Sequence, residues 1–175
     1  MTIQEIHKKC ESKFGKEIIS LEETHGDPYI EVSRLKLFEI AKFLHQDEAL
    51  LFDSLVCVSG VHYPAGKQRN TQVTDEKQDE KKDLFEVVYH FFSFSHKHKL
   101  TLKVVLVADD LKVPTLTPLW KGADFLERET FDMFGIEFVK HPDLRRILCP
   151  DDWEGWPLRK DYVVQEMYKH MKVPL

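Results

Sequence analysis

Two long apolar segments, residues 85–95 and 100–109, constrain the fold of this chain more than any other feature of the sequence. Both are rich in β-branched and aromatic residues, and only the polar tetrapeptide His96–Lys99 separates them. This arrangement predicts a β-hairpin with an exposed polar turn. Both alternating sets of side chains in residues 100–109 are largely apolar. We therefore expect both faces of the hairpin to be covered.

Helices and further strands are predicted around this hairpin. The expected elements are, in order, an amphipathic helix that ends before Gly15, strands over residues 17–23 and 29–32, a helix over 34–45 capped by Ser33, a strand over 51–63 and a helix over 123–134. This order indicates the α+β class, with a mixed, mostly antiparallel sheet flanked by helices and an irregular C-terminal segment.

The length of 175 residues is typical of one domain. We expect this domain to span residues 1–162 and a short tail to occupy residues 163–175. Residues 65–83 contain almost no apolar side chains, so they cannot bury enough surface to offset the entropy lost on ordering. This stretch is predicted to be a flexible loop that holds nothing essential.

Composition argues against several classes of protein. The 25 basic residues are outnumbered by 30 acidic ones, whereas a general nucleic-acid binder needs a basic surface. The longest apolar runs, such as residues 104–108, are far shorter than the ~18 residues of a membrane helix. Residues 1–15 also lack the apolar core of a signal peptide. We therefore expect a soluble chain without a targeting segment.

No sequence motif indicates a metal, nucleotide or catalytic site. Cys10, Cys57 and Cys149 are widely spaced and form no CxxC pair. His96 and His98 have no third ligand nearby, so we interpret them as residues of the polar turn. The GxGxxG, Walker, GxSxG and HExxH patterns are all absent. We expect no catalytic, cofactor-binding or metal-binding residue on this chain.

Residues 119–162 combine charges and aromatic side chains, and all three tryptophans of the chain fall within them. A solvated segment does not need so many aromatic residues, and a plain core does not hold so many charges. The stretch is therefore predicted to form a packed polar network or a surface that meets a partner. Its candidate residues are Glu127, Arg128, Glu129, Asp132, His141, Arg145, Arg146, Arg159, Lys160 and Asp161.

Helical geometry limits what these charges can do within residues 123–134, a helix that we expect Gly135 to end. Glu127 and Glu129 would lie about 200° apart around the helix, so they do not form a ready catalytic pair. Arg128 and Asp132 are four residues apart and can pair, but for only ~0.3 to 0.5 kcal/mol on a solvated surface. We expect more distant partners for these charges.

One run of this sequence resembles a known family. The residues ERETFDMFGIEFVKHPDLRRIL (127–148), followed by EGWPLRKDY (154–162), are similar to the signature of the thirty-kilodalton subunit, also called the C subunit, of proton-pumping NADH:quinone oxidoreductase, respiratory complex I. The resemblance is close over residues 85–162 and looser over 52–64. Trp156 departs from it, because the family more often has histidine there.

The resemblance implies a non-catalytic subunit in the peripheral arm of the complex, with FMN, iron-sulfur clusters and quinone on partner subunits. The implied partners are the D subunit, which holds the quinone site, and the B and I subunits, which hold clusters. The resemblance also implies that the chain lies on the cytoplasmic side of a bacterial inner membrane and meets this membrane only through the complex. One alternative is the same module in a related membrane-bound hydrogenase or in another quinone oxidoreductase. Another is a free-standing hydrolase that uses Glu127, Glu129 and His141.

Overall fold

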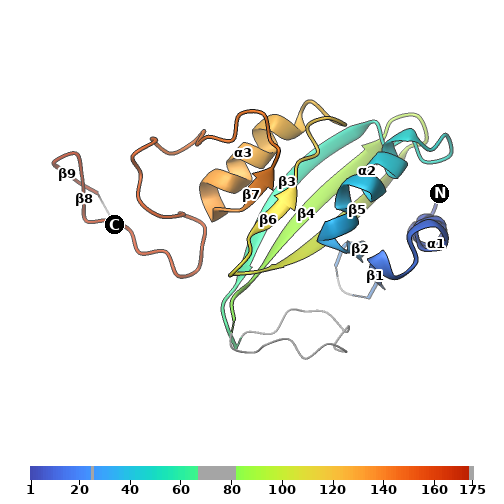
Figure 1. The fold of residues 1–175 in the computed structure, drawn as a ribbon, viewed down its shortest axis with the longest axis horizontal. Coiled ribbons are helices and arrows are strands. Elements are labelled where there is room, and N and C mark those ends of the chain that lie inside the picture. Colours follow the sequence, from blue (N-terminus) through green and yellow to red (C-terminus); the bar gives the residue numbers. More distant parts are fainter. Residues whose placement is uncertain (25, 67–81, 174–175) are drawn as a thin grey trace.

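A five-stranded sheet forms the centre of the computed structural model, which describes residues 1–24, 26–66 and 82–173. Its strands are β1 (Ile18–Glu22), β2 (Tyr29–Val32), β3 (Ser54–Tyr63), β4 (Leu84–Ser93) and β5 (His98–Val107), in the spatial order β1-β2-β5-β4-β3 (Figure 1). The β2/β5 pair is parallel and the other three pairs are antiparallel. The predicted α+β fold with a mixed, mostly antiparallel sheet is confirmed. Most of the loop predicted at residues 65–83 lies outside the described residues.

The predicted hairpin is formed by β4 and β5, which pair from Leu84↔Val107 to Ser93↔His98. Its turn comes earlier than expected, at residues 94–97, and Lys97 has a φ of 53°. His98 therefore belongs to a strand and is buried, with its Nε2 2.8 Å from the carbonyl oxygen of Leu50. Burial lowers the pKa of His98. The prediction that His98 lies in an exposed turn was wrong, because the four-residue turn begins at residue 94 rather than 96 and β5 already starts at His98.

Three α-helices accompany the sheet: α1 (Ile3–Phe14), α2 (Leu37–Gln46) and α3 (Ala123–Phe134). A capping box between Thr2 and Glu5 begins α1, and Gly15 with a φ of 54° follows its end. The predicted cap at Ser33 is not formed. A 3-10 turn, η2 (Arg34–Lys36), lies between Ser33 and α2, and the Ser33 side chain makes no capping hydrogen bond. A second short turn, η1 (Gly15–Glu17), joins α1 to β1.

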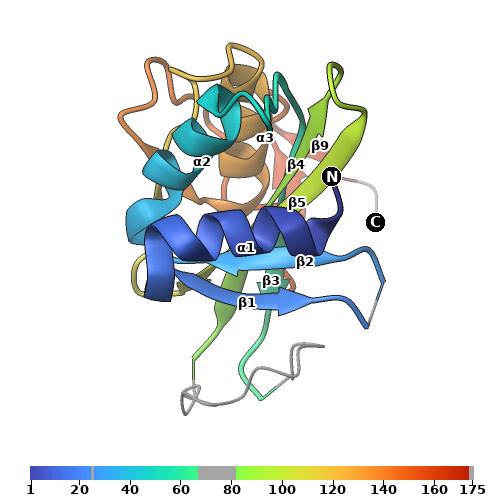
Figure 2. The same cartoon turned by 90° about the vertical axis from the view of Figure 1, so that its right-hand side faces the viewer.

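The hydrophobic core lies on one face of the sheet. Phe85, Val87, Tyr89 and Phe91 of β4 all belong to the core cluster, whereas the alternate residues of this strand do not. The helices pack over this face (Figures 1 and 2). The expectation that helices or strands cover both faces is not met within the described residues. Side chains on the second face instead contact one another along the sheet, as where Lys103 lies 3.8 Å from the ring centre of Tyr29.

The remaining strands are short and frame α3. A parallel pair, β6 (Lys112–Pro114) and β7 (Glu137–Val139), brackets this helix in the sequence. The chain then continues as residues 140–173, hereafter the C-terminal segment, which runs beside α3 and away from the sheet (Figure 1). Its only regular structure within the described residues is the small hairpin of β8 (Met167–Tyr168) and β9 (Met171–Lys172). The predicted irregular C-terminal segment is confirmed.

Candidate functional site

Asp132, near the end of α3, attaches the C-terminal segment to this helix. Its buried Oδ2 accepts hydrogen bonds from the backbone N–H groups of Ile147, Leu148 and Cys149 at 3.0, 2.7 and 2.8 Å, and its Oδ1 accepts one from Arg146 Nη1 at 2.7 Å. Burial alone would raise the pKa of Asp132, but the four donors outweigh it and hold the pKa below its ordinary value. One ionised carboxylate thus fixes four consecutive residues of the segment.

Arg128 holds the same stretch of chain from the preceding turn of α3. Its Nε and Nη2 donate to the carbonyl oxygens of Arg145 and Arg146, each at 3.3 Å, and its Nη1 lies 3.9 Å from Asp124 Oδ1. The pair that Arg128 and Asp132 could make is not formed, because both side chains turn toward residues 145–149 instead. The more distant partners that we expected for these charges are confirmed.

Glu127 of α3 is fully buried. Its carboxylate accepts hydrogen bonds from Thr115 Oγ1 at 2.5 Å and from the Leu116 N–H at 2.7 Å. Burial raises the pKa of Glu127 to about 7, although these two hydrogen bonds act in the opposite direction. Glu127 therefore joins α3 to the chain that follows β6, and it is the site's candidate for holding a proton near neutral pH.

His141 lies beside this carboxylate with its side chain completely buried. Its Nδ1 accepts a hydrogen bond from the Asp143 N–H at 3.1 Å, so its Nε2 carries the proton that is donated to the Asp124 carbonyl oxygen at 3.2 Å. The same Nε2 is 3.6 Å from Asp124 Oδ1 and 4.0 Å from Glu127 Oε2. The structure thus brings together Glu127 and His141, but Glu129 points outward and is exposed.

The second attachment of the C-terminal segment lies at Gly135, directly after α3. Gly135 has a φ of 71°, as predicted for the residue that ends this helix, and a side chain there would come within 2.5 Å of the Trp156 ring. Arg159 Nε donates to the Phe134 carbonyl oxygen at 2.6 Å, and the Leu158 N–H donates to that of Met133 at 3.1 Å. The exposed end of the helix backbone is thereby covered by residues 156–159.

A third attachment connects the segment to the sheet through His62 of β3. The Lys160 N–H donates to His62 Nδ1 at 3.0 Å, and His62 Nε2 donates to Asp83 Oδ2 at 2.9 Å. The imidazole is stacked on Phe85 with the ring centres 4.3 Å apart. His62 is buried, and it was not among the predicted site residues. The sequence does mark His62 in one way. It is a polar residue at a position of β3 where the alternation of side chains calls for a residue that faces the core.

These three attachments lie in the part of the chain that identifies its family. Residues 30–168 match the sequence pattern of the family described as respiratory-chain NADH dehydrogenase, 30 Kd subunit. The chain belongs to this family. It is 42% identical over 170 residues to the C subunit of the NADH-quinone oxidoreductase of Chloroherpeton thalassium, and the match covers 96% of this chain and 64% of that relative.

Two solved structures share the fold of this chain. A trypsin-resistant fragment of Nqo5 is 26% identical, with a TM-score of 0.59 over 82% of this chain and 100% of the fragment. A chain of the membrane-bound sulfane sulfur reductase, an archaeal respiratory membrane complex, has a TM-score of 0.69 over 91% of this chain and 85% of its own length. That chain is only 19% identical, so its likeness concerns the fold alone.

The family signature divides into buried and outward-facing charges. Glu127, Arg128, Asp132, His141 and Arg146 make the internal contacts described above. Four other predicted residues lie at the surface, and the structure does not join them into one network with the buried set. Glu129 and Lys160 are exposed, Arg145 forms a surface pair with Asp143 at 2.9 Å, and Asp161, 62% exposed, lies 3.6 Å from His62 Nδ1.

Trp156, the departure from the usual family residue, packs between two arginines. The Arg146 guanidinium lies 4.6 Å and that of Arg159 5.7 Å from its ring centre, and Phe131 meets it edge-on at 5.3 Å. An indole ring offers a larger face to these cations than an imidazole would. In this member of the family the aromatic side chain therefore links the first attachment to the second.

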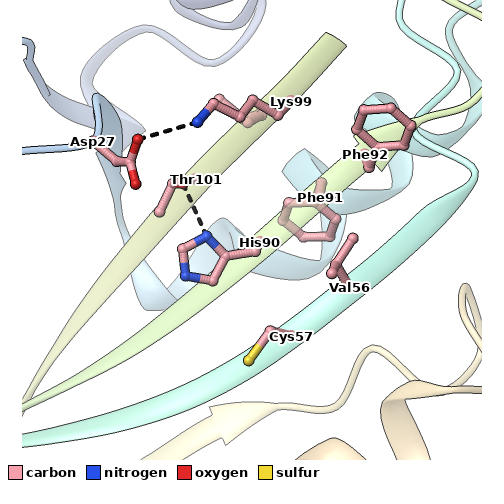
Figure 3. A pocket seen from close by; sticks show the side chains of 9 residues that line it. Asp27, Val56, Cys57, His90, Phe91, Phe92, Lys99 and Thr101 are labelled. Atoms are coloured by element: carbon pink, nitrogen blue, oxygen red, sulfur yellow. Dashed lines mark hydrogen bonds and ion pairs between the residues drawn. The ribbon is translucent and has the colours of Figure 1, made fainter. Parts of the chain in front are cut away.

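A shallow pocket lies on the second face of the sheet, away from these attachments (Figure 3). It is lined by Asp27, Val56, Cys57, His90, Phe91, Phe92, Lys99, Leu100 and Thr101. Its polar side chains are already engaged, since His90 Nδ1 contacts Thr101 Oγ1 at 3.1 Å and Lys99 pairs with Asp27 at 3.1 Å. Cys57 lies opposite His90 in the β3/β4 register, but its Sγ contacts Ser59 Oγ at 3.2 Å, and the described residues include no hydrogen bond between Cys57 and His90. The pocket therefore contains no hydrogen-bonded pair of nucleophile and base.

Metal-binding groups and membrane helices were also sought in the described residues. In this part of the chain no three His, Cys, Asp or Glu side chains gather where they could hold a metal ion. Cys10, Cys57 and Cys149 lie on separate elements and form no disulfide. None of the helices found over 1–24, 26–66 and 82–173 is long and apolar enough to span a bilayer.

Proposed function

We propose that the chain is a non-catalytic subunit in the peripheral arm of an NADH:quinone oxidoreductase. In this role it holds neighbouring subunits in position while electrons pass from NADH through FMN and iron-sulfur clusters to quinone, coupled to proton translocation. The proposed neighbours are the D subunit, with the quinone site, and the B and I subunits, with clusters. The complex would place the chain on the cytoplasmic side of a bacterial inner membrane.

The observation that carries this proposal is a segment with a fixed backbone and exposed apolar side chains. Asp132, Gly135 and His62 attach the C-terminal segment at three places, yet large apolar side chains along it remain open to solvent. Their exposed fractions are 63% for Leu148, 54% for Leu158, 84% for Val163, 53% for Met167 and 63% for Met171. A pre-ordered backbone loses little entropy on binding, so such a segment is suited to a permanent partner.

The donor groups on the chain support placing the cofactors on other subunits. Iron-sulfur clusters need several thiolates converging on one point, and the three cysteines here are far apart in the sequence and lie on different elements. The outward-facing Glu129, Arg145, Lys160 and Asp161 have room to meet charges of a partner. The buried charges are explained by their internal hydrogen bonds, without any role in electron or proton transfer.

Affinity purification from native membranes tests the proposal. A tagged copy of the chain should co-purify with subunits that carry FMN and iron-sulfur clusters, identified by mass spectrometry and by visible absorption. Leu158→Asp should reduce this recovery strongly, because it places a charge in the exposed apolar row of the C-terminal segment. Ile19→Asp, at a residue 48% exposed on β1, is the matched control and should leave recovery intact. Recovery of the chain alone would refute the proposal.

Two alternatives make different predictions in the same experiment. If the module serves a membrane-bound hydrogenase or another quinone oxidoreductase, the co-purifying subunits will differ from those of an NADH:quinone oxidoreductase. A free-standing hydrolase would show turnover by the purified chain alone. The geometry disfavours the hydrolase, since Glu127 and His141 are buried while Glu129 is exposed on the same helix.

A further inference from the structure

The guanidinium of Arg159 is held firmly at the surface of the second attachment. Its Nε donates to the Phe134 carbonyl oxygen at 2.6 Å. Its central carbon lies 5.0 Å from the ring centre of Phe85 and 5.7 Å from that of Trp156. The group is half-buried. A backbone acceptor and two aromatic rings thus fix the guanidinium plane before any partner arrives.

The two terminal nitrogens of Arg159 have no carboxylate of their own within the described residues. Arg146, by contrast, is paired with Asp132 at 2.7 Å. Two acidic residues are close enough for their charges to act on Arg159, but neither forms an ion pair with it within the described residues. Asp83 accepts hydrogen bonds from His62 and from the Ala65 N–H, each at 2.9 Å, and the side chain of Asp161 is 62% exposed. Arg159 is only partly buried, so part of its side chain faces solvent.

This arrangement favours a carboxylate as the missing group. Burial lowers the pKa of Arg159, and the charges of Asp161 and Asp83 only partly offset that effect. A desolvated guanidinium gains most from a bidentate carboxylate, which matches its planar pair of N–H groups. The surrounding surface adds an apolar side chain at Leu158, 54% exposed, and a second cation at the exposed Lys160. A partner segment with an acidic and an apolar residue fits these features.

We propose that Arg159 is the receptor for an aspartate or glutamate side chain of a neighbouring subunit, in a pair framed by Phe85 and Trp156. The inference rests on the proposed function, because it requires that the chain be docked in a larger complex. It also divides the arginines of the family signature by role. Arg128 and Arg146 act within the chain, where they hold the C-terminal segment to α3. Arg159 uses its Nε for the second attachment and keeps its terminal nitrogens for the partner.

Zero-length cross-linking tests the pair directly. Arg159→Lys places a primary amine at this position, and a water-soluble carbodiimide joins an amine only to a carboxylate in contact with it. The purified complex that contains this variant is treated, digested and analysed by mass spectrometry. We expect a cross-linked peptide between position 159 and an Asp or Glu of another subunit. Cross-links only to Asp83 or Asp161 of the same chain, or none at position 159, would overturn the inference.

A second measurement tests the role of Arg159 if the Arg159→Lys chain is not incorporated into the complex. Arg159→Gln removes the charge, and we expect the fraction of chain retained in the complex to fall about tenfold or more, as for the loss of one member of a desolvated interfacial pair. The unfolding midpoint of the separate chain should shift by only about 2 °C. Lys16→Gln, at an exposed lysine on η1, is the charge-matched control and should be retained like the parent.

The outcomes separate this inference from the function on which it rests. If the unaltered chain does not co-purify with a respiratory complex, the proposed function fails. If the unaltered chain co-purifies and Arg159→Gln is retained equally well, the proposed function stands and the role of Arg159 is refuted. An equal loss of retention and of folding stability in Arg159→Gln would also refute it, because the side chain would then act within the chain.

Discussion

Arg146 Nη1 lies 2.7 Å from Oδ1 of Asp132, although the two residues are 14 positions apart in the sequence. Between them the chain leaves α3, forms β7 and folds back along the same helix. The Asp132 carboxylate then accepts three further hydrogen bonds from backbone N–H groups beyond Arg146. These hydrogen bonds fix the backbone of an irregular segment that buries few apolar side chains of its own.

Replacing Asp132 should release this segment. In Asp132→Ala the guanidinium of Arg146 and three backbone N–H groups lose a buried acceptor, and we expect a loss of ~3 kcal/mol in the free energy of unfolding. Chemical denaturation measures this change, and limited trypsin digestion should cleave after Arg145 and Arg146 much faster. Glu129→Ala, on the exposed side of the same helix, should stay within about 0.5 kcal/mol of the parent. Equal effects of the two substitutions would contradict this account.

The buried carboxyl of Glu127 predicts a specific dependence of stability on pH. Its pKa rises from the ordinary 4.5 to about 7 on folding, so the folded state retains a proton that the unfolded state releases between these values. The contribution is fully present below pH 4.5 and is lost as the pH rises to 7, for a total of about 3 kcal/mol. Glu127→Gln should remove this decline and be at least as stable as the parent above pH 7.

The prediction is checked by subtracting the stability curve of Glu127→Gln from that of the parent, each measured as the free energy of unfolding against pH. Other groups titrate equally in both proteins, so their contributions cancel. Gln fits the site, since its amide oxygen can accept from the Leu116 N–H and its amide nitrogen can donate to Thr115 Oγ1. Urea denaturation at a series of pH values from 4.5 to 8 would provide the curves. A constant difference across this range would mean that Glu127 does not change protonation there.

Much of α3 could be predicted from the sequence, and the partners of its charges could not. The helix and the glycine that ends it are encoded locally, by apolar spacing and by the positive φ that Gly135 adopts. The contacts of Asp132 depend on an irregular chain returning to the helix after 14 residues. No periodic pattern marks such a return. The alternation of charged and aromatic residues indicated that partners existed without identifying them.

The two misplaced or missed histidines show how turn geometry and strand alternation limit prediction. His98 was assigned to a polar turn because four polar residues follow one another, but the turn ends two residues earlier, at Lys97, and the side chain of His98 is buried against Leu50. His62 lies at a core-facing position of β3, where alternation marks it as unusual. Its partners, Asp83 and the Lys160 backbone, come from remote parts of the chain.

Gly135 provides a steric test of the second attachment. In Gly135→Ala the new methyl group would come within 2.5 Å of the Trp156 ring and 2.7 Å of Arg159 Nη2, at a φ of 71°. We expect a loss of ~2 kcal/mol or more, from backbone strain and displacement of Trp156 together. Gly122→Ala is the control, because Gly122 has a φ of −65° and open space around it. Differential scanning calorimetry of both variants should show a lower midpoint for Gly135→Ala alone.

Hydrogen exchange tests the attachment to the sheet. The Lys160 N–H is protected by His62 Nδ1, and His62→Phe keeps an aromatic ring on Phe85 while removing this acceptor. We expect the Lys160 amide to exchange about tenfold faster or more, since a hydrogen bond of ~1.4 kcal/mol limits local opening by that factor. Amides of β4 should keep their rates. Unchanged exchange at Lys160 would show that the segment is held there by other contacts.

If the buried charges of this subunit hold structure and do not transfer protons, a respiratory complex that carries Glu127→Gln should work normally. Glu127 combines complete burial with a pKa of about 7, which are the properties a proton relay would need. The measurement is the rate of quinone reduction and the number of protons translocated per electron, each normalised to the amount of assembled complex. We predict values equal to those of the unaltered complex. Full assembly with lost quinone reduction or lost proton translocation would contradict the account.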